Sequence, residues 1–298
     1  MTKKIIFAGI AMLFAASCSN DNDVNVINSD ELVPVTVHVD AFSVEQGEFP
    51  AIKATAIGDY ATVKAITLAF YKSDGTQAYK HTQFKADAST FTTYGEFSTS
   101  LTAGNYTLVV LGYGQGTTNE EITLTSPTSA GFTGTVRETF AYTEPVVVNT
   151  STPLDISATL DRIVSKVSVK STDGRSADVK TIRVSMSGGS KSFNPTTGLA
   201  TDNNGFANSV VTSTAVGNTT NIGSALFLIT DEQNVNVTIE TLDNDDNVLF
   251  SKTVNNVPLK RNRVTTLTGA MYSVTGTANA GSFQVNTDWL TPEDDIVF

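Results

Sequence analysis

Apolar and polar residues alternate along most of this 298-residue chain, and many of the apolar positions are β-branched. Such alternation is typical of strands that bury one face, and clusters of Gly, Asn, Asp and Ser interrupt it at short intervals. No long segment has apolar residues at helical spacing. The pattern therefore predicts an all-β fold built from β-sandwiches. The clearest predicted strand segments are VPVTVHVDAF (33–42), AITLAFYKSDG (65–75), GNYTLVVLGYG (104–114), SKVSVKS (165–171), TIRVSMSGG (181–189) and VNVTIETLDNDDNVLFSKTV (235–254).

The last of these segments is predicted to be a hairpin whose two strands meet at DNDDN, residues 243–247. The same acidic run can be aligned with the beginning of a calcium-binding loop. However, Val248 occupies the position that requires glycine, and Val254 occupies that of the terminal glutamate. We therefore predict a hairpin turn here, and no metal site.

Two domains are predicted from an interruption near the middle of the chain. A cluster of Thr, Ser and Pro at 150–153 separates two apolar stretches, and each side has enough predicted strands to close a sandwich. The predicted N-terminal β-sandwich comprises residues 31–152, and the C-terminal β-sandwich comprises residues 153–298.

The first 17 residues have the pattern of an export signal. Lys3 and Lys4 precede an apolar run over residues 5–16, which is shorter than the roughly 20 residues of a membrane-spanning helix. The run ends at small residues before Cys18 and resembles a bacterial lipobox, which predicts lipidation of Cys18. An ordinary signal peptide with Cys18 as a free thiol is the alternative. Because Cys18 is the only cysteine, it has no disulfide partner within the chain, which favours lipidation.

Residues 18–30 are predicted to form an acidic, solvated tether, since residues 19–31 carry four acidic side chains and no basic one. Removal of residues 1–17 takes away two lysines and no acid, so the formal net charge changes from −11 to −13. This charge opposes nucleic-acid binding, which requires clustered Lys and Arg.

Catalytic signatures are missing from the sequence. His38 and His81 belong to no recognisable metal-ligand spacing, and no GxSxG motif is present. We therefore predict no catalytic residue, no cofactor and no enzymatic activity. Trp289, the only tryptophan, is either a binding platform or an aromatic that fills a groove.

Five segments together resemble a fimbrillin of the major and minor fimbria family, the subunits of type V pili. They are the lipobox around Cys18, VPVTVHVDAF (33–42), IKATAIGDYATVKAITLAFYKSDG (52–75), LDISATLDRIVSKVSV (154–169) and VPLKRNRVTTLTGAMY (257–272). The resemblance implies two tandem transthyretin-like β-sandwiches in a palmitate-carrying lipoprotein precursor. It also implies export to the outer membrane, followed by proteolytic removal of the first strand and donor-strand exchange in a surface fimbria.

Residue by residue, the resemblance assigns the removable strand to the apolar positions of 33–42 and places the cut between Lys53 and Ala54. The family usually has arginine at the cut, whereas this chain has no arginine before Arg137. Either a protease that accepts lysine acts here, or the strand stays and the protein is a lipid-anchored basal subunit. Lys53 can also be read as a solvated loop lysine. The residues of the removable strand that are predicted to be buried are Val33, Val35, Val37, Val39 and Phe42.

The C-terminal tail is predicted to be a donor strand for a neighbouring subunit, or else to pair within its own second domain. Pro292 and the acids after it interrupt a regular strand pattern. The apolar residues assigned to the donor strand are Phe283, Val285, Trp289, Leu290, Ile296, Val297 and Phe298.

Three classes of function follow from these features. The first is a structural or adhesive fimbrial subunit, or a non-polymerising fimbrial anchor, whose partners are other subunits, the outer membrane through the lipid, and a host protein or glycan. The second is a lipid-anchored glycan-binding protein, for which one tryptophan and eight tyrosines supply aromatic surface. The third, a secreted hydrolase, is disfavoured by the missing catalytic motifs.

Overall fold

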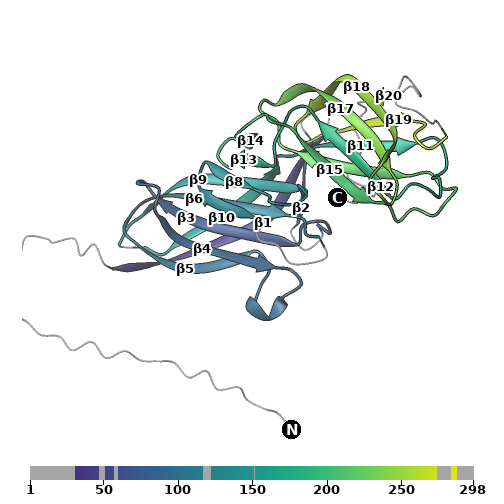
Figure 1. Cartoon of the computed structure of the whole chain (residues 1–298). Coiled ribbons are helices and arrows are strands. Elements are labelled where there is room, and N and C mark those ends of the chain that lie inside the picture. The colour runs from purple at the N-terminus through teal and green to yellow at the C-terminus, as the bar shows by residue number, and fades with distance from the viewer. Residues whose placement is uncertain are drawn as a thin grey trace, which may run out of the picture.

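The computed structural model describes residues 31–46, 51–56, 60–116, 122–150, 152–273 and 283–286, with the backbone alone for 44–46 and 51–56. In these ranges it contains β-strands and one short 3-10 helix, which confirms the predicted all-β fold (Figure 1). The elements are β1 (Leu32–Gln46), β2 (Ala51–Ala56), β3 (Ala65–Lys72), β4 (Gln77–Phe84), η1 (Ala88–Thr90), β5 (Glu96–Thr102), β6 (Gly104–Tyr113), β7 (Thr123–Ser126), β8 (Ser129–Gly131), β9 (Thr139–Val148), β10 (Leu154–Arg162), β11 (Ser165–Ser171), β12 (Thr181–Met186), β13 (Ser192–Asn194), β14 (Leu199–Ala200), β15 (Phe206–Val211), β16 (Asn221–Leu226), β17 (Glu232–Leu242), β18 (Val248–Lys260), β19 (Val264–Gly269) and β20 (Gln284–Asn286).

The first domain is a sandwich made from a single sheet that folds over on itself. Its strand order is β2-β1-β10-β9-β6-β3-β4, and β5 pairs with β1 as well. The β9–β10 junction at the fold has only two residue pairs, Asp161–Ala141 and Arg162–Phe140. One hydrophobic core collects buried side chains from β1, β5 and β10 on one side and from β3, β6 and β9 on the other. Apolar side chains on the inward face of each layer thus remove each other from water.

The second domain is a sandwich of two four-stranded sheets, ordered β16-β11-β19-β20 and β15-β12-β17-β18. Their inward faces share a second core, to which Val169, Ile182, Ile239 and Leu267 contribute fully buried side chains. This confirms the prediction of two tandem β-sandwiches.

A fourth sheet, made of short strands, lies between the two sandwiches. Its order is β14-β13-β8-β7, so two of its strands come from each half of the chain. The core beside it also mixes the halves, since it contains Tyr71 and Tyr113 together with Phe193 and Phe227. The rings of Phe193 and Phe227 stack with their centroids 4.2 Å apart. The domains are therefore joined by shared apolar packing as well as by the chain.

The position of β10 differs from the predicted domain boundary at 152/153. β10 pairs in parallel with β1 and antiparallel with β9, so it completes the first sheet. The Thr, Ser and Pro cluster at 150–153 marks the connection between β9 and β10 inside one sandwich, not a linker between domains. By sheet membership, the change of domain falls after Arg162.

The predicted hairpin at 243–247 is confirmed by the pairing of β17 with β18. Oδ1 of Asp243 accepts hydrogen bonds from the backbone N–H groups of Asp245 (2.8 Å) and Asn247 (2.9 Å), and its Oδ2 accepts one from Asn247 Nδ2 (3.0 Å). Hydrogen bonds from the Asn247 side chain and backbone lower the pKa of Asp243. Hydrogen bonds from residues of the run itself to the Asp243 carboxylate thus close the turn.

Candidate functional site

Strand β1 lies inside the first sheet, with partners along both edges. Residues 35–43 pair in parallel with β10 on one edge. On the other edge, residues 32–38 pair with β5 and residues 41–46 pair with β2, both antiparallel. Removal of β1 would therefore leave unpaired backbone groups on both β10 and β5, facing each other across an open groove.

The five apolar residues predicted for the removable strand all lie on β1 and face the core of the first domain. The pairing register with β10 shifts between Val39 and Ala41, so Phe42, and not Ala41, continues the inward face after the bulge. Whether the strand is removed remains a prediction. The exposed fractions are 3% for Val33, 1% for Val35, 1% for Val37, 4% for Val39 and 0% for Phe42.

Phe42 is held in a cluster of aromatic rings. Its ring centroid lies 4.9 Å from that of Phe140 and 5.4 Å from that of Tyr60. Gly112 makes room for it, because a Cβ atom at residue 112 would come within 2.6 Å of the Phe42 ring. This close approach fits β1 tightly to the opposite layer of the sandwich.

A buried ion pair lies beside this aromatic cluster. Nη2 of Arg162 is 2.7 Å from Oε1 of Glu138, whose side chain is 1% exposed. The Tyr60 hydroxyl donates to the same carboxylate at 3.0 Å, and the Thr62 hydroxyl donates to its other oxygen. Burial, the largest cause, raises the pKa of Tyr60 to about 12. Sequence reasoning missed this cluster because its members come from distant segments and form no motif.

Arg162 also connects the two domains. Its Nη1 donates to Oδ1 of Asn262 in the second domain at 3.3 Å, while its guanidinium group lies 5.4 Å from the ring centroid of Phe140. The backbone N–H of Asn262 donates to the carbonyl oxygen of Val164 at 2.8 Å. The end of β10 is thus fixed to the turn that joins β18 and β19.

Lys53, expected in a loop, lies on the edge strand β2, where its backbone pairs with Val44 of β1. Cleavage between Lys53 and Ala54 remains a prediction. Among the described strands, β2 pairs with β1 alone, along one edge. Cys18 and the predicted tether lie outside the described residues.

Part of the predicted donor tail pairs within its own second domain, which was the alternative raised by the sequence. β20 is antiparallel to β19, with Val285 opposite Leu267, and Phe283 packs against the second core. Val285 remains 42% exposed. The other predicted tail residues lie outside the described part of the chain; they are Trp289, Leu290, Ile296, Val297 and Phe298.

Asp173 fixes the chain just before this tail. Its Oδ1 accepts the backbone N–H of Met271 (3.0 Å), and its Oδ2 accepts those of Tyr272 (2.8 Å) and Ser273 (2.7 Å). Burial alone would raise the pKa of Asp173, but these backbone donors outweigh it and lower the pKa. Asp173 therefore fixes the backbone of residues 271–273.

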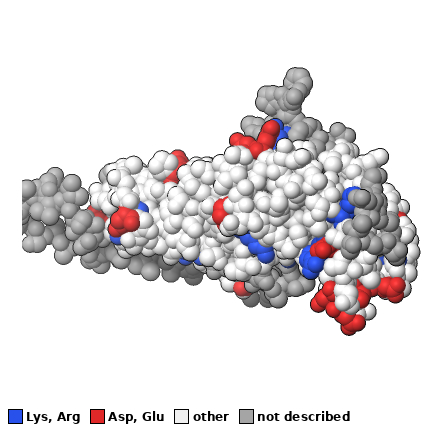
Figure 2. All heavy atoms as spheres, turned by 45° about the horizontal axis from the view of Figure 1, so that its top comes forward, with Lys and Arg blue, Asp and Glu red and all other residues white. Residues whose placement is uncertain are grey.

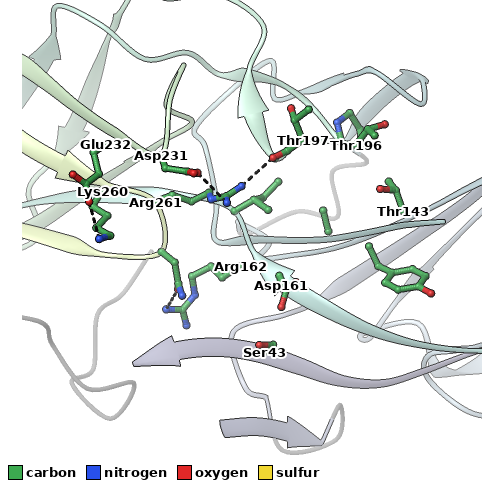
Figure 3. A pocket seen from close by; sticks show the side chains of 16 residues that line it. Ser43, Thr143, Asp161, Arg162, Thr196, Thr197, Asp231, Glu232, Lys260 and Arg261 are labelled. Atoms are coloured by element: carbon green, nitrogen blue, oxygen red, sulfur yellow. Dashed lines mark hydrogen bonds and ion pairs between the residues drawn. The ribbon is translucent and has the colours of Figure 1, made fainter. Parts of the chain in front are cut away.

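A cleft of about 580 Å³ lies between the two domains (Figure 3). The first domain contributes residues of β1, β9 and β10, and the second contributes the β13–β14 turn, the start of β17 and the end of β18. The lining is mainly polar. The labelled side chains in Figure 3 are Ser43, Thr143, Asp161, Arg162, Thr196, Thr197, Asp231, Glu232, Lys260 and Arg261.

Ion pairs hold the second-domain wall of the cleft. Nη2 of Arg261 lies 2.9 Å from Oδ1 of Asp231, and its Nη1 donates to the carbonyl oxygen of Thr197 at 2.9 Å. Nζ of Lys260 lies 2.7 Å from Oε1 of Glu232. These contacts pair the charged side chains that line the second-domain wall of the cleft (Figure 3).

Gly198 makes the Arg261 contact possible. It has a φ of +70°, in the left-handed region that favours glycine, and a Cβ atom there would lie 3.0 Å from Arg261 Nη1.

Within the described ranges, no group of three or more His, Cys, Asp or Glu side chains could hold a metal ion. No helix in those ranges is long and apolar enough to cross a membrane.

These features define a two-domain β-sandwich protein. Its first strand is paired along both edges, and a polar cleft lies between its domains. The chain belongs to DUF6562, a family of unknown function whose model matches residues 33–293. A search of curated proteins found no match.

Solved structures share the fold at low sequence identity. A "putative adhesin" from Bacteroides ovatus matches with a TM-score of 0.51 and 11% identity, over 88% of this chain and 97% of that chain. A second "putative adhesin" from Bacteroides ovatus ATCC 8483 gives a TM-score of 0.48 and 11% identity, over 80% and 88%. A fimbrial anchor protein from Porphyromonas gingivalis gives 0.44 and 11%, over 87% and 98%. At 11% identity, the likeness to the first of these structures shows the fold alone.

Proposed function

We propose that this protein is a structural or adhesive subunit of a cell-surface fimbria and that β1 occupies, in the precursor, the groove that a neighbouring subunit's strand fills after assembly. The observation that carries the proposal is the pairing of β1 with β10 on one edge and β5 on the other, with its inward side chains buried. The name of the fold neighbour with a TM-score of 0.51, a "putative adhesin", supports a role at the surface.

The physical logic is strand replacement. An empty groove would expose apolar core together with two unpaired strand edges, which is an aggregation hazard. A strand from another subunit can restore the main-chain hydrogen bonds, and its alternate side chains can occupy the positions left by the valines of β1. Because the inward side chains alternate and then shift at the bulge after Val39, the groove would accept one register of the incoming strand in preference to others.

Cleavage after Lys53 would separate β1 from the rest of the chain in this scheme, and lipidation of Cys18 would keep the precursor at the outer membrane until then. If β1 stays in place instead, the protein is a non-polymerising, lipid-anchored fimbrial anchor. The two forms differ in their N-terminal residue, which makes them separable by experiment.

The decisive experiment is mass spectrometry of the N terminus of protein from shed surface material and from outer membranes. A chain that starts at Ala54 in the shed material supports strand removal, and a Lys53→Gln variant should then lose that product. Lys64→Gln serves as the matched control, because Lys64 is exposed and precedes β3. A start at lipidated Cys18 in every fraction would overturn strand removal and leave the anchor.

A further inference from the structure

The cleft between the two domains has the position and size of a ligand site. Ligand pockets occur preferentially at domain interfaces and have volumes of about 300–1,000 Å³. The cleft, at about 580 Å³, lies within this range, and both domains contribute side chains to it. Its position does not depend on β1 being removed, because the cleft is present with β1 in place.

The charges of the lining disfavour a strongly charged ligand. Asp161, Asp231 and Glu232 carry three negative charges, and Arg162, Lys260 and Arg261 carry three positive ones, so the formal net charge of the lining is zero. On the face of the molecule drawn in Figure 2, basic side chains lie in small, separate groups. An anion or a cation would meet as many repelling as attracting groups.

The cleft contains both hydrogen-bond donors and hydrogen-bond acceptors. Carboxylates accept, Arg261 and Lys260 donate, and the threonine hydroxyls do both. Arg261 is preorganised by Asp231 and Thr197, so less conformational freedom is lost when a ligand binds. The Asp231 and Glu232 side chains remain 66% and 68% exposed, which leaves them accessible to a ligand.

One flat group completes the lining. Tyr142 also belongs to the lining residues, but its ring packs against the core of the first domain and its hydroxyl donates to Glu144 at 2.6 Å. The planar guanidinium group of Arg261 lies on the second-domain side. Flat groups of this kind can pack against the apolar face of a sugar ring, while hydroxyl-rich edges meet the surrounding donors and acceptors.

A second hollow of about 470 Å³ continues the surface along β17 and β18. It shares Glu232 and Lys260 with the cleft and adds the polar side chains of Gln233, Asn234 and Thr265. A linear ligand that filled the cleft would thus find further hydrogen-bonding groups beyond it.

The lining thus has a formal net charge of zero, both hydrogen-bond donors and acceptors, a flat group and an extended polar surface. From this combination we propose that the interdomain cleft binds a neutral carbohydrate chain. The proposal adds a ligand site to the protein beyond fimbrial assembly, which is measured separately by polymerisation. Ser43 of β1 is part of the lining and would leave with β1, whereas the lining residues of β9, β10 and the second domain stay.

The test uses the full mature chain on an array of immobilised neutral oligosaccharides of glucose, mannose, galactose and N-acetylhexosamines, with anionic oligosaccharides on the same array. A hit is then titrated calorimetrically. Thr197→Trp places a large side chain at the cleft and retains the backbone carbonyl that Arg261 uses. Thr253→Trp is the matched control, because Thr253 is an exposed threonine of β18 that does not line the cleft.

We expect a neutral oligosaccharide to bind, Thr197→Trp to weaken its binding about tenfold or more, and Thr253→Trp to leave it unchanged. Equal melting temperatures of the two variants would exclude a folding defect; if Thr197→Trp melts lower, Glu232→Gln replaces it and the same loss is expected. No binding to any neutral oligosaccharide, binding confined to anionic ones, or full affinity in the cleft variant would overturn the proposal.

Discussion

Arg162 and Glu138 form an ion pair of 2.7 Å at the place where the first sandwich meets the second, with the glutamate side chain 1% exposed. Arg162 belongs to β10 and Glu138 lies immediately before β9, so the pair fastens the β9–β10 junction between the two layers of the first sheet. Its Arg162 side continues to Asn262 in the second domain.

We expect Glu138→Gln to lower the free energy of unfolding by about 3–5 kcal/mol, because it leaves Arg162 with its counter-charge removed in a buried position. Urea denaturation at neutral pH measures the change. Glu232→Gln is the control, since its pair with Lys260 is also 2.7 Å long but exposed, and such pairs contribute about 1 kcal/mol or less. Equal losses in the two variants would show that burial of the Glu138 pair is not decisive.

Gly112→Ala is expected to destabilise the first domain by about 1–3 kcal/mol, because its new Cβ overlaps the Phe42 ring. In the double variant with Phe42→Leu, the smaller side chain removes that overlap. Urea unfolding of the two single variants and the double variant forms a cycle, and the double loss should be less than the sum. Simple additivity would mean that the glycine is not fitted to β1.

A disulfide across β1 and β5 tests whether β1 must leave the groove. Thr36 lies opposite Ser98 in the antiparallel pair, where Cα atoms are about 4.5 or 5.5 Å apart, and both separations suit a disulfide. In a chain that begins after Cys18, the oxidised Thr36→Cys/Ser98→Cys variant should remain monomeric after protease treatment. Added reductant should restore polymerisation. Polymers that form equally well under both conditions would exclude strand release.

We expect Lys166 to make the stability of the protein depend on pH between neutral and alkaline conditions. The side chain is 1% exposed, and burial, the largest cause, lowers its pKa from 10.5 to about 7. In the window between these two values the unfolded chain binds more protons than the folded one, so the free energy of unfolding rises with pH, by at most about 1.4 kcal/mol per pH unit.

Lys166→Met should therefore flatten this rise and stabilise the protein most on the acidic side of the window. Urea denaturation at about pH 6, 7.5 and 9 measures the slope, below the range where tyrosines titrate. Lys170→Met, on the same strand and half-buried, is the control and should retain the wild-type slope. If the free energy of unfolding of Lys166→Met changes with pH as steeply as that of the wild type, other groups cause the pH dependence.

The sequence predicted the strands well where alternation is local, as in β3, β6, β11 and the β17–β18 hairpin. It misplaced β10 because a turn inside a sandwich and a linker between sandwiches share the same Thr, Ser and Pro chemistry. It also gave no sign that Lys166 is buried. In SKVSVKS that lysine alternates with valines, yet its side chain is 1% exposed and lies against Gly223 of the neighbouring strand β16.

The two candidate sites also differ in how far the sequence predicts them. The inward valines of β1 follow from period two, and the bulge that brings Phe42 inward is a consequence of pairing with β10 that no local pattern shows. The interdomain cleft could not be predicted, since Tyr142, Thr197 and Arg261 come from segments far apart in sequence and are brought together only by the packing of two domains.

The position of β10 has a mechanical consequence. Only Ile163 and Val164 separate its last residue from β11, and β11 runs parallel to β19, the strand that precedes the C-terminal tail. If a neighbour's strand replaces β1, tension in the fibre passes from that strand sideways into β10, along the chain into β11, and sideways again into β19. Force along the strands loads each row of hydrogen bonds in shear, so many bonds must break together, and the subunit resists pulling as a unit instead of opening one bond at a time.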